Sequence, residues 1–230
     1  MPTSHRLSFR PAKKPISELI DKFGGQPVWL EQPEWPLSRS TGKPMQFIGQ
    51  FSLQRIEGYQ GTAQFAYLFM SDDGDEYIDG TWEPEGGENC LLLQPGNIAS
   101  VTTNPIENGP GLYAMKKKFG RKRLSPVSCE FHVDHTSISE PEFLSQDQLL
   151  KMDDADGDRY VDATSGNKIG GVPGFLQNDE FPSEPAIDWL LALQLDSGSV
   201  PFHINFGDAG IGYAFVKADG SDARFLWQCC

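Results

Sequence analysis

One ten-residue stretch of this chain occurs twice in nearly the same form, and the repeat restricts the fold more than any other feature. Residues 22–31 read KFGGQPVWLE and residues 168–177 read KIGGVPGFLQ, 146 positions apart. Trp29 and Trp35 align with Phe175 and Phe181, so aromatic residues match aromatic residues. Seven of the fifteen positions from 22 to 36 are identical, namely Lys22, Gly24, Gly25, Pro27, Leu30, Glu34 and Pro36 with Lys168, Gly170, Gly171, Pro173, Leu176, Glu180 and Pro182.

The match resumes at the same offset further along the chain. Six more identities pair Gly61, Ala63, Tyr67, Phe69, Asp73 and Gly74 with Gly207, Ala209, Tyr213, Phe215, Asp219 and Gly220. Thirteen identities in twenty-nine positions exceed what chance supplies, and a fixed period is the signature of an internal duplication. The sequence therefore predicts two pseudo-twofold-related halves.

Each repeat unit has the composition of a small β structure. Two adjacent glycines followed by x-Pro predict a tight turn, because glycine adopts positive φ and proline fixes the exit. Continuous apolar runs bounded by turn residues then predict buried strands. These runs are 46–51, 64–70 and 90–94 in the first unit and 190–195, 211–217 and 224–228 in the second.

Helical patterns are few, so the predicted fold class is a β-dominated α+β protein. Residues 16–23 have apolar positions at helical spacing, and 141–154 has proline near its start with leucines on one face. A further strand is predicted over 127–133. We divide the chain into a basic flexible leader (1–15), a first unit (16–94), a connector with strands, a basic turn and one helix (95–160) and a second unit (161–230), fused into one globular domain.

The charge of the chain points to cationic partners. There are 19 Lys and Arg against 32 Asp and Glu, a net charge of −13. Six of the cations lie in Lys116–Arg123, so the rest of the chain has 13 cations against 32 anions, or −19. Such a surface repels nucleic acid and attracts basic proteins. The basic window is interpreted as a solvated hairpin tip, with contact to RNA or an acidic partner as the alternative.

The compartment is predicted from what the sequence lacks. No stretch has the roughly 18 apolar residues of a membrane span, and the N-terminus has no apolar signal region. Cys90, Cys129, Cys229 and Cys230 form no C-x-x-C pair, so we expect reduced thiols and no zinc. We also expect no nucleotide cofactor, because no phosphate loop is present. These features favour a cytoplasmic protein.

The G-G-x-P-x-[WF]-L turn, the glutamine in the next strand and G-D-A-G at 207–210 resemble the bacterial YwqG-like family. The resemblance implies a duplicated β-rich α+β fold and no established activity. KFGGQPVWL and GKPMQFIGQF also resemble, more weakly, programmed cell death protein two and related ribosome-assembly factors, which implies a domain that holds another protein. Their cysteines are replaced here by residues 38–41, SRST, so zinc is not implied.

Several side chains are candidates for partner binding. Trp29, Trp35, Phe175 and Phe181 either line a peptide groove or pack the turns onto the core, and their presence in both units favours packing. Gln50 and Gln194 lie in apolar strands, where a buried amide needs hydrogen-bond partners. We expect them to bind backbone groups of the Gly-Gly turns, with ligand contact as the alternative. Asp208 flanks the second-unit Gly207.

One segment partly fits a calcium loop. In DADGDRYVDATS the carboxylates of Asp154, Asp156, Asp158 and Asp162 match ligand positions. Arg159 replaces the required glycine and Ser165 the bidentate glutamate, so an acidic turn is favoured over an incomplete calcium site.

The function expected from these features is a non-enzymatic module that shields or escorts a basic protein, either a toxin in an immunity role or a ribosomal protein. The alternative is a hydrolase-like enzyme whose site is assembled from both units, with His203 and Asp208 as its candidate residues. His132 and His135 are a weak metal signal because no third ligand is evident.

Overall fold

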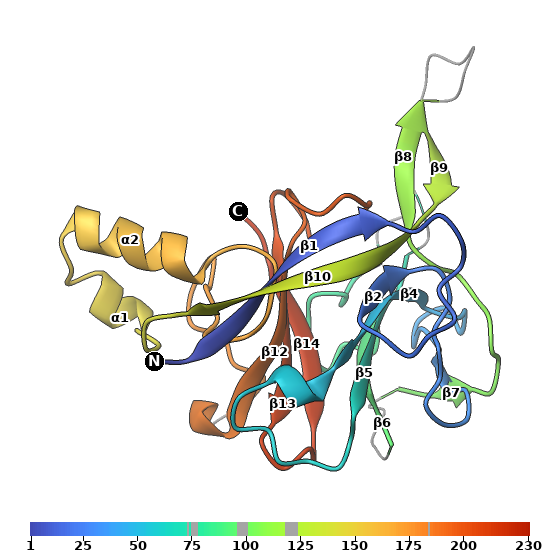
Figure 1. Ribbon diagram of the computed structural model, residues 1–230, viewed down its shortest axis with the longest axis horizontal. Helices are drawn as coiled ribbons and strands as arrows, with labels where there is room; N and C mark the ends of the chain where they lie inside the picture. The colour runs from blue at the N-terminus through green and yellow to red at the C-terminus, as the bar shows by residue number, and fades with distance from the viewer. Residues whose placement is uncertain (73, 75–77, 96–100, 118–123, 184) are drawn as a thin grey trace.

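The fold is built around one antiparallel sheet of ten strands (Figure 1). The computed structural model describes residues 1–72, 74, 78–95, 101–117, 124–183 and 185–230. The strand order is β14-β13-β12-β11-β1-β10-β2-β4-β5-β6. The sheet curls until its edge strands β6 and β14 touch, so it is nearly closed.

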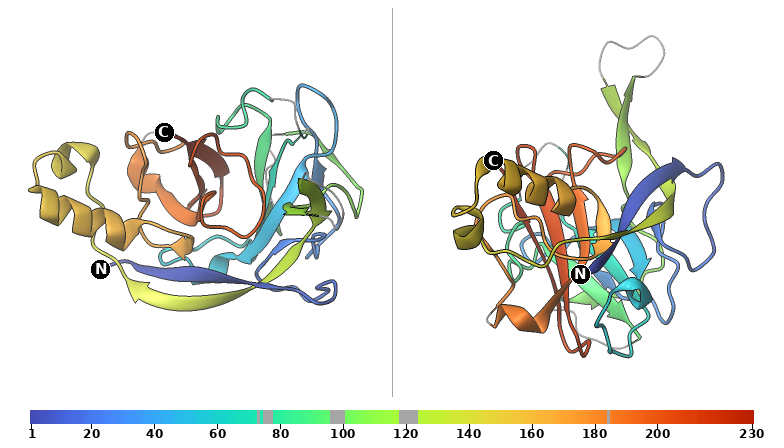
Figure 2. Two further views of the ribbon diagram at one scale, coloured as in Figure 1. Left: turned by 90° about the horizontal axis from the view of Figure 1, so that it is seen from above. Right: turned by 60° about the vertical axis from the view of Figure 1, so that its left-hand side comes forward.

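The middle of the sheet is a long two-stranded ribbon of β1 (Thr3–Pro11) and β10 (Glu130–Ser139). Figure 2 shows this ribbon crossing beneath the strands on either side of it. Outward from β10 lie β2 (Lys22–Gly24), β4 (Gln46–Ser52), β5 (Phe65–Met70) and β6 (Asn89–Gln94), called here the first strand set. Outward from β1 lie β11 (Lys168–Gly170), β12 (Trp189–Asp196), β13 (Ile211–Lys217) and β14 (Ala223–Gln228), the second strand set.

The N-terminal residues correct the expectation of a flexible leader over 1–15. Thr3–Pro11 is the strand β1, paired with β10 on one side and with β11 on the other. Leu7 and Phe9 pack against the core while Ser8 and Arg10 are exposed. This is the period-two alternation of a half-buried strand. Strand pairing on both sides of β1 gives these residues a fixed place.

Side chains alternate between one interior core and two outer clusters. Leu68 and Met70 of β5, with Ala214 and Val216 of β13, point into a single core shared by both strand sets. Their neighbours point outward into two aromatic clusters, one on each strand set. All six apolar strands predicted from the sequence are present within a residue or two of their expected ends.

The helices differ from the prediction. Residues 16–21 are irregular and residues 22–24 are β2, because sheet pairing that buries Phe23 overrides a weak helical pattern. The single helix expected over 141–154 is not formed. Its place is taken by a short turn of helix, α1 (Gln146–Leu149), and a second helix, α2 (Asp154–Thr164), begins at the residue where the expected helix was to end. The two 3-10 turns are η1 (Leu53–Arg55) and η2 (Ala186–Asp188).

Two small sheets lie outside the main one. β3 (Trp35–Pro36) pairs with β7 (Thr103–Asn104), and β8 (Tyr113–Lys117) pairs with β9 (Leu124–Ser128). The strand predicted over 127–133 is divided between β9 and β10. β8 and β9 form the hairpin expected at the basic window, whose residues 118–123 lie outside the described residues.

Candidate functional site

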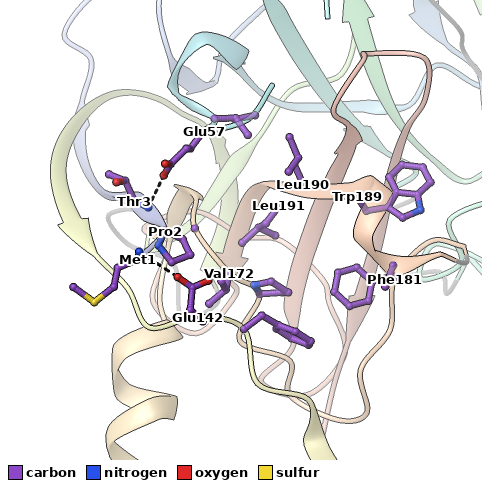
Figure 3. A pocket seen from close by; sticks show the side chains of 15 residues that line it. Met1, Pro2, Thr3, Glu57, Glu142, Val172, Phe181, Trp189, Leu190 and Leu191 are labelled. Carbon is purple, nitrogen blue, oxygen red and sulfur yellow. Dashed lines mark hydrogen bonds and ion pairs between the residues drawn. The ribbon is translucent and has the colours of Figure 1, made fainter. Parts of the chain in front are cut away.

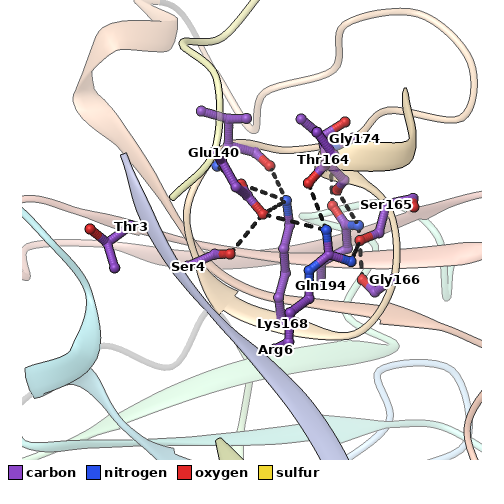
Figure 4. A network of polar contacts seen from close by, with 12 residues as sticks. Thr3, Ser4, Arg6, Glu140, Thr164, Ser165, Gly166, Lys168, Gly174 and Gln194 are labelled. Carbon is purple, nitrogen blue, oxygen red and sulfur yellow. Dashed lines mark hydrogen bonds and ion pairs between the residues drawn. The ribbon is translucent and has the colours of Figure 1, made fainter. Parts of the chain in front are cut away.

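A buried ion pair fixes the second Gly-Gly turn (Figure 4). Lys168 Nζ donates to both carboxylate oxygens of Glu140 at 2.9 Å and to the backbone oxygen of Val172 at 2.6 Å. Glu140 in turn accepts from Val172 N–H at 3.0 Å and from Ser4 Oγ at 2.7 Å. Both side chains of the ion pair are fully buried. Burial lowers the pKa of Lys168 to about 8, although the Glu140 carboxylate acts in the opposite direction.

The first Gly-Gly turn is fixed in a similar way. Lys22 Nζ donates to Glu130 Oε1 at 2.6 Å and to the backbone oxygen of Ile16 at 3.2 Å. Both second glycines of the turns, Gly25 and Gly171, have positive φ and lie against these carboxylates, where a Cβ atom would clash. The turns therefore require glycine for conformation and for space.

The two buried glutamines bind backbone groups that flank the Gly-Gly turns and not the turn glycines themselves. Gln50 accepts from Val28 N–H at 2.7 Å and donates to Ile20 O at 3.1 Å. Gln194 accepts from Gly174 N–H at 2.9 Å and donates to Thr164 O and Gly166 O. Both amides are fully buried and bind backbone groups on either side of a turn. Neither is exposed to a ligand.

The turn aromatics pack onto the outer face of each strand set. Trp35 is fully buried, and Trp29 stacks on Tyr67 with ring centroids 5.1 Å apart. Phe175 and Phe181 contact each other at 5.3 Å and pack on Phe215. All four aromatics therefore pack onto the sheet, while Phe181 also lines a groove and Phe175 a smaller cavity of about 110 Å³.

Tyrosine hydroxyls tie the same segments to the strands. Tyr67 Oη donates to Val28 O and accepts from Leu30 N–H, and Tyr213 makes the matching bonds with Gly174 and Leu176. Burial raises the pKa of Tyr67 to about 12 and raises that of Tyr213 as well. Both phenols are therefore neutral donors at physiological pH.

A groove lies beside the second Gly-Gly turn (Figure 3). Its volume is about 560 Å³, within the range of small-ligand and side-chain pockets. We call it the acidic groove; it is lined by Met1, Pro2, Thr3, Ile56, Glu57, Glu142, Phe143, Gly171, Val172, Pro173, Phe181, Ala186, Trp189, Leu190 and Leu191.

The acidic groove combines an apolar floor with two exposed carboxylates. Trp189 and Leu191 project from β12, and Val172 is held by the Lys168–Glu140 pair beneath it. Glu57 accepts from Thr3 N–H at 3.1 Å, and Glu142 pairs with the Met1 amino group at 3.1 Å. Figure 3 marks both contacts with dashed lines. Such a surface suits an apolar side chain flanked by cations.

The other candidate residues do not join this groove. Asp208 is exposed in the loop before β13. His203 stacks on Tyr113 and lines a separate cavity of about 160 Å³ with Gln46 and Asp72. Asp208 does not line that cavity.

The segment expected as a calcium loop is a helix. Asp154, Asp156, Asp158 and Asp162 all lie on α2. The Asp153 side chain caps the helix by accepting from Asp156 N–H at 2.9 Å, and carboxylates in a first turn favour the helix dipole. A loop template therefore does not apply to this segment. Across the part of the chain that the structure describes, no three His, Cys, Asp or Glu side chains are grouped so as to hold a metal.

Sequence reasoning missed the groove and the ion pairs. Lys22 and Lys168 are identities of the repeat, and a lysine retained inside two buried strands was a signal that a buried carboxylate must be near. Glu57 and Glu142 gave no such signal, because they come together only through the pairing of β1.

A family model described as a domain of unknown function, DUF1963, matches residues 21–229. The chain belongs to this family. DUF1963 is the YwqG-like family that the Gly-Gly turns resemble, and the likeness to programmed cell death protein two has no support. No curated protein matches the chain. The DUF1963 match includes both Gly-Gly turns and both strand sets, whereas β1 precedes it. Among the described residues, no helix is long and apolar enough to cross a membrane.

Proposed function

We propose that this protein is a non-enzymatic binding module for a basic protein and that the acidic groove is its docking site. The proposal rests on one observation: an apolar floor and the carboxylates of Glu57 and Glu142 lie in the same groove. A partner would insert an apolar side chain against Trp189 and Leu191 and place lysines or arginines at the two carboxylates. The net charge of −13 would speed its capture by electrostatic steering.

The anchoring of the second Gly-Gly turn supports a preformed site. The turn that lines the groove is tied to a buried ion pair through both the N–H and the carbonyl of Val172. A rigid wall reduces the ordering cost of binding.

The partner is of the toxin or ribosomal-protein type, and a cytoplasmic location is part of the proposal. The four cysteines of this protein are free thiols, which suits a reducing compartment.

The test is capture of basic proteins from the native cell at low and at high salt, with wild type and two charge-matched variants. Glu57→Lys with Glu142→Lys should lose the partner. Glu18→Lys with Glu83→Lys changes the net charge equally at exposed positions elsewhere and should retain it. Salt should weaken capture markedly, since screening shortens the reach of exposed charges.

If both double variants lose the partner equally, the partner is attracted by the net charge of the protein and not by the acidic groove. If no basic protein is captured and a substrate screen finds turnover that His203→Ala abolishes, the enzyme alternative replaces the proposal.

We also propose that residues 16–94 and 161–230 are copies of one duplicated unit arranged about a pseudo-twofold axis. The matching contacts of Lys22 and Lys168, of Gln50 and Gln194 and of Tyr67 and Tyr213 support this. β4 and β12 each also have a register shift, at 47/49 and at 191/193. Replacing residues 168–177 by the sequence of 22–31 should preserve cooperative folding, whereas a scrambled segment should abolish it.

A further inference from the structure

A second groove lies at the opposite end of the β1–β10 ribbon. Its volume is about 520 Å³, and we call it the basic groove. Residues 11–15, which begin at the last residue of β1, line the groove together with Lys116 of β8, so two basic segments about a hundred positions apart become neighbours. The groove is lined by Pro11, Ala12, Lys13, Lys14, Pro15, Gly25, Ala114, Lys116, Ser128, Cys129, Glu130, Phe131 and Pro201.

The basic and acidic grooves occupy corresponding places. Each is bordered by the second glycine of a Gly-Gly turn, Gly25 in one and Gly171 in the other. Each also lies at an end of the ribbon, next to the start of one strand and the end of its partner. Their charged groups are opposite in sign.

The lysines of the basic groove are available to a ligand. Lys13, Lys14 and Lys116 are exposed, and within the described residues none of them has an ion pair or side-chain hydrogen bond. The one carboxylate in the lining, Glu130, is already paired with Lys22. Three unpaired lysines therefore meet at one groove of a chain that has 32 acidic residues.

We infer that the basic groove binds an acidic polypeptide segment that carries an apolar side chain. Pro11, Pro15 and Pro201 provide an exposed apolar contact surface, and the lysines are positioned to pair with glutamate or aspartate side chains. Charges further than a Debye length, about 8 Å at physiological salt, are largely screened, so the nearby lysines dominate for a peptide with a few carboxylates. A nucleic acid carries a phosphate on every nucleotide, is repelled more strongly by a molecule with a net charge of −13 and is disfavoured. This inference does not depend on the proposed function.

The test measures the binding of a fluorescein-labelled decapeptide, with five glutamates and one central phenylalanine, by fluorescence anisotropy at physiological salt, where distant charges are screened. Wild type should bind it. Lys14→Glu and Lys116→Glu should each weaken binding about tenfold, because each removes a charge-assisted contact and adds repulsion. Lys151→Glu makes the same charge change at an exposed site in the α1–α2 connection and should bind within about twofold of wild type. All three positions are exposed, so the unfolding midpoints should coincide.

Cys129 supplies a second readout, because it lines the groove and is only partly buried. The bound peptide should slow its alkylation by iodoacetamide, followed by mass spectrometry, and should leave the exposed Cys230 unaffected. The inference is overturned if wild type does not bind the peptide, if Lys151→Glu weakens binding as much as Lys14→Glu, or if Cys129 is not protected. Tighter binding of a single-stranded DNA decamer than of the peptide would also overturn it, in favour of a nucleic-acid site.

Discussion

At the scale of single residues, a buried lysine stands beside each Gly-Gly turn, and the two differ in how completely their carboxylates are enclosed. The Glu140 side chain is fully buried, whereas 13% of the Glu130 side chain is exposed. Removing one partner of a buried pair leaves an uncompensated charge. Lys168→Met should therefore lower the free energy of unfolding by about 3–5 kcal/mol, measured by urea denaturation.

Lys22→Met is the matched control and should cost less, because water can reach Glu130. Adding Glu140→Gln to Lys168→Met should recover part of the loss, since the oxygen of a neutral amide still accepts from Val172 N–H and its NH2 can donate to Ser4 Oγ. Equal costs for the two lysine variants would contradict the assigned role of burial.

His5 provides a pH dependence at the same scale. It lies on β1 beside His135, with ring centroids 6.4 Å apart, and Asp21 accepts from both Arg55 and His135. Burial lowers the pKa of His5 below 6.5, and the Arg55 and His135 charges act in the same direction. As the pH falls, His5 is therefore protonated in the unfolded chain before it is protonated in the folded protein. The contribution of His5 to the free energy of unfolding is complete above pH 6.5 and is lost as the pH drops through the lowered pKa.

His5→Gln should reduce this dependence, seen as a smaller loss of unfolding free energy between about pH 7.5 and about pH 5.5. An unchanged slope in His5→Gln would exclude His5 as the source.

At the scale of elements, the strongest sequence patterns gave the correct structure and the weakest did not. The six continuous apolar runs are strands because each is buried on both faces, inside the curled sheet and beneath the outer aromatics. β1 was missed because only Leu7 and Phe9 are apolar among its nine residues, and its basic side chains suggested a leader. The acidic run at 154–162 matched a metal template more visibly than a helix start, although Asp153 is a good N-cap.

The placement of β1 can be tested by substitution. Phe9 packs edge-to-face on Phe23, Phe131 and Phe202. Phe9→Ala should destabilise the protein by about 2–3 kcal/mol, somewhat less than a fully buried phenylalanine. The neighbouring Arg10→Ala removes an exposed, solvent-screened pair with Asp134 and should leave the unfolding midpoint close to that of wild type. A flexible leader would make both substitutions neutral in thermal or urea unfolding.

α2 offers a stabilising change. Gly157 lies inside the helix, and a Cβ atom there would meet nothing within 4 Å. Gly157→Ala should therefore raise the free energy of unfolding by about 0.5–1 kcal/mol, the difference in helix propensity. Gly171→Ala is the contrasting variant and should destabilise, because Gly171 has positive φ and lies against Glu140. If residues 154–162 were a loop in solution, Gly157→Ala would bring no gain in chemical denaturation.

At the scale of the whole molecule, the grooves could not be predicted because both depend on contacts across the full chain. β1 reaches the second strand set and β10 reaches the first, so each set is completed by a strand from elsewhere in the sequence. The acidic groove needs Thr3, Glu57 and Leu190 together, and the basic groove needs Lys14 and Lys116. The local sequence patterns do not show which distant segments come into contact.

This arrangement predicts that neither strand set folds alone. A fragment of residues 161–230 lacks β1, which pairs with β11 over Ser4–Arg6, and it lacks Glu140, the partner of buried Lys168. It would also expose the face of β12–β14 that packs in the shared core. The fragment should be unfolded by circular dichroism, and mixing it with residues 1–160 should restore native β structure and Trp189 fluorescence. The intact chain should unfold in one cooperative transition, because one core joins both sets. A fragment 161–230 with its own cooperative transition would mean that the second unit is an independent domain and that β1 merely rests against it.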